Sequence, residues 1–68
     1  MTNDELDIKE TTFVYDNTTY QGHYYVEGDI VHVTSALGSK EEQLKNRDAK
    51  AVATVLLKDI VKAAKRLV

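Results

Sequence analysis

The chain of 68 residues contains no cysteine, no proline and no tryptophan, and it has only three glycines. The absence of cysteine excludes disulfide bonds and thiolate metal sites, and it favours a reducing compartment. Three glycines are too few for a glycine-rich phosphate loop. No apolar run approaches the ~20 residues that a membrane span requires, and the acidic start MTNDELDIKE lacks a signal pattern. We therefore expect a soluble, cytoplasmic protein with no membrane contact.

The length indicates one domain near the lower size limit for a self-contained core. A chain of ~60 residues buries only about 60% of its unfolded surface, which favours help from a partner subunit. The net charge of −2 disfavours nucleic-acid binding by the chain as a whole. From Arg47 onward, however, six basic residues face two acidic ones, whereas three basic and nine acidic residues precede it. An acidic front and a basic tail attract each other, within the fold or between copies.

Residues that favour β-structure crowd the first half of the chain and predict two successive hairpins. The expected strands are 11–15, 20–27 and 30–35, separated by the turn-prone DNTT and by Glu27-Gly28-Asp29. Glycine at the first central position of the second turn suits a type II′ turn.

The second hairpin has two faces of different character. The turn fixes the cross-strand pairs Val26 with Val31, Tyr24 with Val33, Tyr25 with His32, and His23 with Thr34. One face then carries Tyr24, Val26, Val31 and Val33. The other carries His23, Tyr25, Glu27, Ile30, His32 and Thr34, a mixed surface that is unsuited to be the main core.

The C-terminal segment, about 47–67, has the periodicity of an amphipathic helix. Its apolar arc covers roughly half the circumference, wider than the ~100° stripe of a minimal surface helix, so we expect a three-stranded sheet to leave part of it uncovered. A capping box at Ser39 offers an earlier start, but such a helix would be about 40 Å long and would overreach the strands. We place a break near Lys45-Asn46, with Asn46 or Asp48 as the cap, and interpret 40–44 as a short edge strand or an extended linker.

These elements predict an α+β fold. A three- or four-stranded antiparallel meander precedes one long C-terminal helix, which packs on the face that holds Tyr24 and Val33. Residues 11–68 form the single domain, and residues 1–10 form an acidic, frayed N-terminus.

The run YQGHYYVEGDIVHV, from Tyr20 to Val33, is followed by GSK, by Gln43-Leu44 and by an Ala/Leu-rich helix. In these features the chain resembles a family of short bacterial and prophage-encoded proteins of unassigned function. They share a G-x-(W/Y)-Y-V-x-G-x-x-V-x-V pattern, a G-S-K-x-x-Q-L segment and a helix with A-x-x-L-L. The similarity covers about Tyr20 to Leu57, although this chain lacks the proline and the glycine pair at the helix start. The resemblance implies a fold and a phage-like origin, and it brings no catalytic residue.

Two histidines on the mixed face suggest a metal site as one alternative. His23 and His32 are diagonal neighbours there, and Glu27 is the nearest third ligand. None of the usual zinc motifs is present, however, so two solvated histidines are the favoured interpretation. Thr34 opposite His23 has neither an oriented base nor an oxyanion hole. We therefore expect neither a cofactor nor enzymatic activity.

A second alternative is binding to nucleic acid through the basic side of the helix. The residues concerned are Lys58, Lys62, Lys65 and Arg66. The same cations also complement the helix dipole near its C-terminus, which is the simpler interpretation.

The leading prediction is a small non-catalytic protein-interaction module that forms a homodimer. The surplus apolar arc of the helix supplies one interface, at Leu57, Val61 and Ala64. The mixed face of the hairpin supplies another, at Tyr25, Ile30 and His32, because tyrosine combines apolar area with a polar tip. If the chain derives from a prophage, its partner is a host protein.

Overall fold

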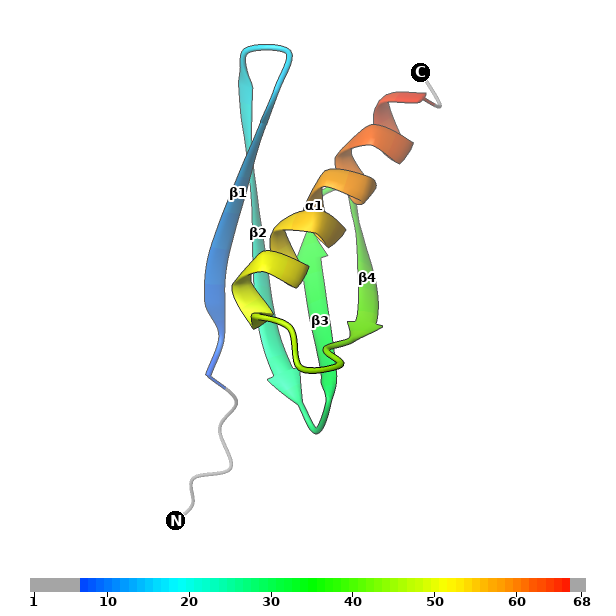
Figure 1. Ribbon diagram of the computed structural model, residues 1–68. Coiled ribbons are helices and arrows are strands. Elements are labelled where there is room, and N and C mark those ends of the chain that lie inside the picture. The colour runs from blue at the N-terminus through cyan, green and yellow to red at the C-terminus, as the bar shows by residue number, and fades with distance from the viewer. Residues whose placement is uncertain (1–6, 67–68) are drawn as a thin grey trace.

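The computed structural model describes residues 7–66 of the chain. Its elements are β1 (Lys9–Tyr15), β2 (Thr18–Glu27), β3 (Ile30–Ser35), β4 (Gly38–Gln43) and α1 (Ala49–Arg66). The four strands form one antiparallel sheet in the order β1-β2-β3-β4, so neighbours in the chain are neighbours in the sheet. Helix α1 lies across one face and contacts all four strands (Figure 1). This architecture confirms the predicted α+β fold.

The hairpin of β2 and β3 has the predicted register. Tyr25 pairs with His32, and the pair Glu27 and Ile30 brackets the two-residue turn. Gly28 has a φ of 63°, which fits the first central position of the predicted turn, where glycine carries no steric penalty.

The first hairpin is longer than predicted at both ends. Asp16 and Asn17 have φ values of 54° and 63°, so these two residues alone make a type I′ turn and β2 begins at Thr18. At the other end, Lys9 pairs with Tyr24 because the ten-residue β2 offers a partner that far back. The predicted frayed terminus is therefore wrong for Lys9 and Glu10, and residues 1–6 lie outside the described residues.

The connection between β4 and α1 resolves the question of where the helix begins. The backbone reverses at Lys45 and Asn46, whose φ values are 52° and 66°, and the Arg47 amide donates to the Leu44 carbonyl at 3.0 Å. Asp48 is the cap, because its carboxylate accepts a hydrogen bond from the Ala51 amide at 3.0 Å. Residues 38–43 form the fourth strand rather than a first helical turn.

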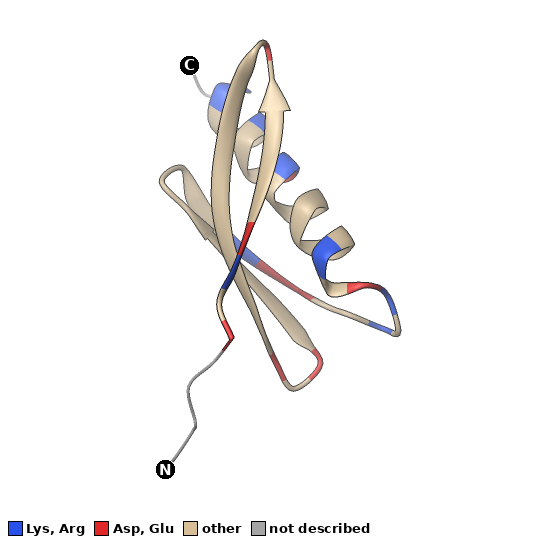
Figure 2. Ribbon diagram, turned by 90° about the vertical axis from the view of Figure 1, so that its left-hand side faces the viewer, with Lys and Arg blue, Asp and Glu red and all other residues tan. Residues whose placement is uncertain are grey.

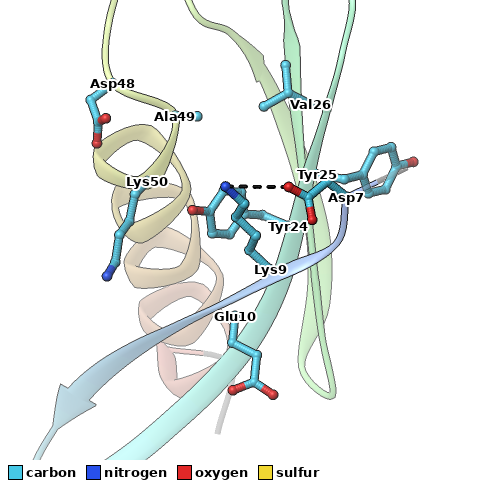
Figure 3. A pocket seen from close by; sticks show the side chains of 9 residues that line it. All are labelled: Asp7, Lys9, Glu10, Tyr24, Tyr25, Val26, Asp48, Ala49 and Lys50. Atoms are coloured by element: carbon cyan, nitrogen blue, oxygen red, sulfur yellow. Dashed lines mark ion pairs between the residues drawn. The ribbon is translucent and has the colours of Figure 1, made fainter. Parts of the chain in front are cut away.

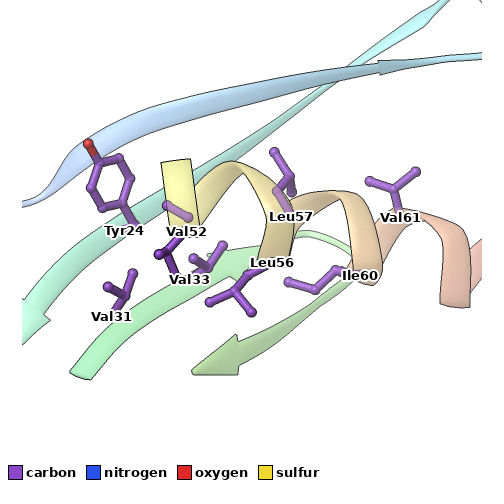
Figure 4. Packing of buried hydrophobic residues seen from close by; sticks show 9 residues of the cluster. Tyr24, Val31, Val33, Val52, Leu56, Leu57, Ile60 and Val61 are labelled. Atoms are coloured by element: carbon purple, nitrogen blue, oxygen red, sulfur yellow. The ribbon is translucent and has the colours of Figure 1, made fainter. Parts of the chain in front are cut away.

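The core lies between α1 and the inward side chains of the sheet (Figure 4). Its buried members are Tyr24, Val31, Val33, Val52, Ala53, Leu56, Leu57, Ile60 and Val61. The prediction that Leu57 and Val61 form an exposed interface is therefore wrong. Because α1 contacts all four strands, most of its apolar arc is covered within one chain, although Ala64, the third residue of the predicted interface, is only half-buried.

Gly22 in β2 lets the helix approach the sheet closely. A Cβ atom there would lie 3.1 Å from a methyl group of Leu57 and 3.3 Å from the Thr34 carbonyl oxygen. Leu57 has no exposed surface into which it can retreat. Packing is thus what favours glycine here, since its backbone is not in the left-handed region.

We expect Gly22→Ala to destabilise the fold by about 1–2 kcal/mol, because overpacking forces the helix or Leu57 to shift. Urea denaturation measures the change. Leu57→Val shortens the opposing side chain, so it should cost less in the Gly22→Ala background than in the wild type. If Leu57→Val lowers the free energy of unfolding equally in the wild type and in Gly22→Ala, the side chains at positions 22 and 57 are not in steric conflict.

A buried polar contact joins β1 to the helix. The hydroxyls of Thr11 and Thr54 are 2.8 Å apart, and Thr54 donates its proton to the Lys50 carbonyl at 2.9 Å. Thr11 must therefore donate to Thr54. Only 3% of Thr11 is exposed, so its hydroxyl depends on this acceptor.

The two threonines should respond differently to removal of the hydroxyl. Thr54→Val leaves the buried Thr11 donor without its partner and should cost about 1–3 kcal/mol. Thr11→Val removes that donor while Thr54 keeps its bond to Lys50, so it should cost clearly less. Thermal or urea unfolding of both variants and the double variant tests this order, and a double variant less stable than Thr54→Val alone would contradict it.

Candidate functional site

The face of the sheet opposite α1 is covered by no other element among residues 7–66 (Figure 1). We call it the outer sheet face. Its strand residues, from the register and the alternation of side chains, are Glu10, Thr12, Val14, Thr19, Gln21, His23, Tyr25, Glu27, Ile30, His32, Thr34, Ser39, Glu41 and Gln43.

The middle of this face holds an ordered row of side chains. The rings of Tyr25 and His32 stack with centroids 4.7 Å apart and planes 13° apart. His32 lies between two carboxylates, with Nδ1 3.1 Å from Glu41 and Nε2 3.8 Å from Glu27. Only 24% of the His32 side chain is exposed. Tyr25, His32 and Glu41 line a shallow hollow of about 400 Å³ with Thr34 and Ser39. The row therefore presents an aromatic ring beside negative charge.

The structure does not assemble the alternative metal site. His23 lies 3.6 Å from Glu10 on the neighbouring strand, whereas Glu27 lies beside His32. The two carboxylates next to His32 approach opposite ring nitrogens, so they do not converge on one point. Among residues 7–66 no group of three or more histidine, aspartate or glutamate side chains is placed to hold a metal ion.

Charge divides between the two sides of the molecule. On the outer sheet face, the side chains of Glu10, Glu27 and Glu41 are 63%, 66% and 67% exposed. Within the strand residues that define this face, lysine and arginine are absent. Most lysine and arginine residues lie along α1 and in the connection before it (Figure 2). The two charged faces therefore lie on opposite sides of the fold, where they cannot neutralise each other within one chain.

A larger hollow, of about 530 Å³, opens where the sheet meets the start of α1 (Figure 3). Tyr24 and Val26 line its wall, and an exposed ion pair of 3.5 Å joins Lys9 to Asp7 beside it. Charges of both signs are mixed here, and Tyr25 points away from the hollow toward the outer sheet face. This hollow thus selects no particular ligand.

The basic residues of the nucleic-acid alternative are placed on α1 as predicted, but they are not equivalent. Lys58 is half-buried, whereas Lys62 and Arg66 are exposed. Lys65 lies over the Tyr20 ring, 5.4 Å from its centroid. Hydrogen bonding to the Tyr20 side chain raises the pKa of Lys65. Lys65 is therefore engaged with the sheet by an aromatic contact.

We expect Tyr20→Phe to lower the pKa of Lys65 toward its usual 10.5, because the ring stays and the hydroxyl is lost. A raised folded-state pKa stabilises the fold below the unfolded-state pKa, and this contribution disappears as pH rises through the folded-state value. The wild type should therefore lose more stability than Tyr20→Phe above about pH 10. An NMR titration of the Lys65 side chain measures the shift, with Tyr25→Phe as the control, because Tyr25 is not among the groups that raise this pKa. An unchanged pKa in Tyr20→Phe would remove the Tyr20 hydroxyl as its cause.

The sequence pattern places Tyr25, Ile30 and His32 on one face, but it did not predict two carboxylates that complete this face in the structure. Glu41 comes from β4, whose pairing with β3 the sequence left open, and Glu10 comes from the segment expected to fray. The available signal was the alternation of GSKEEQ, which places Glu41 opposite His32 once residues 38–43 are taken as a strand.

Comparison with known protein families, curated proteins and solved structures finds no match for this chain. The resemblance to short bacterial and prophage-encoded proteins therefore stays a prediction. Within residues 7–66 no helix has the length and apolar character needed to cross a membrane.

Proposed function

We propose that the protein is a small non-catalytic interaction module that binds a lysine- or arginine-bearing surface of another protein through the outer sheet face. The observation that supports this most directly is the stack of Tyr25 on His32 with Glu27 and Glu41 beside it. A cation within about 6 Å of a tyrosine ring is attracted to its face, and carboxylates accept paired hydrogen bonds from arginine. An aromatic ring and carboxylates that lie side by side can together bind one lysine or arginine side chain.

The surrounding charge supports the same kind of partner. Three exposed carboxylates and no lysine or arginine give the outer sheet face a single sign of charge. Such a face attracts basic surfaces and speeds their encounter. Half-buried Tyr25 and Ile30 add apolar contact area in the middle, where interfaces concentrate their binding energy.

The absence of catalysis is part of this proposal. Thr34 lies opposite His23 in the register, but both side chains are exposed on an open face. Nucleophilic catalysis requires an oriented base and a water-excluded site with oxyanion donors. An open, ordered face is better suited to contact than to chemistry. The resemblance to prophage-encoded proteins adds the expectation of a host partner in the cytoplasm.

Binding of nucleic acid by α1 is the second candidate function. Its specific support is the exposure of Lys62 and Arg66 on the side of the helix that faces solvent. Such binding would depend steeply on salt, because each phosphate contact releases counterions. A DNA or RNA probe whose shift is lost on reversing Lys58 and Lys62 to glutamate would favour this candidate. No binding at low salt would remove it.

The proposed surface is tested by fluorescence anisotropy with a labelled arginine-rich peptide as the probe. We expect Tyr25→Ala and Glu41→Gln each to raise the Kd by about ten-fold, because each removes one half of the cation-binding pair. Glu42→Gln is the matched control: it makes the same charge change on the adjacent residue, whose side chain points to the opposite face.

The control separates a specific site from general acidity. If Glu42→Gln weakens binding as much as Glu41→Gln does, the peptide responds to net charge and the proposed site is wrong. If the wild type does not bind the peptide at low salt, the proposed partner chemistry is wrong.

A further inference from the structure

The two edges of the sheet differ in chemistry. The edge strand β4 carries Lys40, Glu41 and Glu42 in its middle, a usual protection against pairing with another chain. The last five residues of β1, TTFVY from Thr11 to Tyr15, are uncharged and include no proline. All seven residues of β1 pair one-to-one with β2, so no bulge interrupts the edge. Among residues 7–66 no strand pairs with the other side of β1.

The turn geometry shows which backbone groups point outward from β1. A type I′ turn closes with hydrogen bonding between Tyr15 and Thr18, so that pair is hydrogen-bonded. Hydrogen-bonded and non-hydrogen-bonded pairs alternate along an antiparallel ladder. Glu10, Thr12 and Val14 are therefore the residues whose N–H and C=O groups point away from β2. The side chain of Val14 also adds exposed apolar surface, at 62% exposure.

These outward groups are self-complementary in an antiparallel arrangement. With a two-fold axis at Thr12, each Thr12 faces Thr12 of the second copy, and Glu10 faces Val14. The three residues then exchange about six backbone hydrogen bonds between the copies. No two like charges are directly opposite, because Lys9 faces Tyr15 of the second copy.

The other edge does not offer the same match. The Leu44 amide donates to the Asp29 carbonyl at 2.8 Å, which makes that pair hydrogen-bonded. The alternation then makes Ser39, Glu41 and Gln43 the outward-pointing residues of β4. Pairing of two β4 strands about their centre would place one Glu41 directly opposite the other, which is unfavourable.

We propose that two copies of the chain associate through antiparallel pairing of their β1 strands, which joins the two sheets into one of eight strands. Both α1 helices then lie on the same side of the joined sheet, and both outer sheet faces lie on the other. Figure 1 shows α1 in front of the sheet and no described helix or strand beyond β1, which is where the second copy is placed. This dimer does not use Leu57 or Val61, which are buried in each chain, and it does not depend on the proposed partner of the outer sheet face.

Sedimentation equilibrium of the full-length chain tests the proposal. We expect the wild type to be a dimer whose dissociation constant rises by about ten-fold or more in Thr12→Pro, because proline removes the outward N–H of both copies. That N–H is not used in the pairing with β2, so the monomer keeps its fold, which circular dichroism verifies. Ser39→Pro is the matched control: it makes the same change at an outward position of β4, and the dimer should persist.

A charge exchange tests the register. Thr12→Lys and Thr12→Glu each place like charges opposite each other at the two-fold axis and should each weaken the dimer. An equimolar mixture of the two should form a heterodimer about ten-fold tighter than either variant alone. Peptide binding is read separately in Thr12→Pro, which adds no charge to the outer sheet face. Loss of the dimer without loss of peptide binding in that variant leaves the proposed site of this face unaffected.

Three results would overturn the proposal. The first is a wild-type chain that stays monomeric up to about 1 mM. The second is a dimer that is unaffected by Thr12→Pro, or that is lost in Ser39→Pro while Thr12→Pro leaves it intact. The third is a mixture of the lysine and glutamate variants that associates no better than either variant alone.

Discussion

The approach of α1 to the sheet at Gly22 is the constraint on which the rest of the structure depends. Because no side chain separates the backbone of β2 from Leu57, the helix lies low enough for the central part of its apolar arc, from Val52 to Val61, to be buried against the sheet. Leu57 and Val61 are thereby fully buried within one chain. Because α1 is the only helix among residues 7–66, no described element covers the other face of the sheet or its two edges.

The same packing explains the distribution of charge around the helix. Inward positions of β4 lie at the flank of α1, where full burial ends, so they can carry charged groups. Lys40 reaches Asp59 at 4.0 Å, and Glu42 binds Arg47 at 2.8 Å in the connection before the helix. These exposed pairs add little stability. These pairs engage charged groups of the inner side with one another. Among the described residues, Glu10, Glu27 and Glu41 on the outer sheet face form no ion pair with lysine or arginine.

Much of the fold followed from local chemistry, and the deviations have identifiable causes. Glu27-Gly28-Asp29 determined the register of β2 and β3, because a two-residue turn leaves little freedom in the pairing. β2 begins two residues earlier than predicted. The sequence DNTT is typical of a four-residue turn, whereas only Asp16 and Asn17 adopt positive φ. The surplus apolar arc was misjudged because periodicity measures the width of a stripe but not the number of strands that it crosses. The candidate site was predicted only in part. Glu10 and Glu41 come from β1 and β4, and how these strands pair with their neighbours depends on the tertiary fold rather than on the local sequence.

The order of the outer sheet face bears on how tightly so small a protein can bind. Association costs about 0.5–1.5 kcal/mol for each long side chain that must be fixed. Tyr25 and His32 are already held by their stack and by the flanking carboxylates, so little of this cost remains for them. In an edge-paired dimer two such rows lie on one continuous sheet, and a partner with two basic segments engages the second row at a high effective concentration. Preorganisation and bivalence thus compensate for the small area that each chain offers.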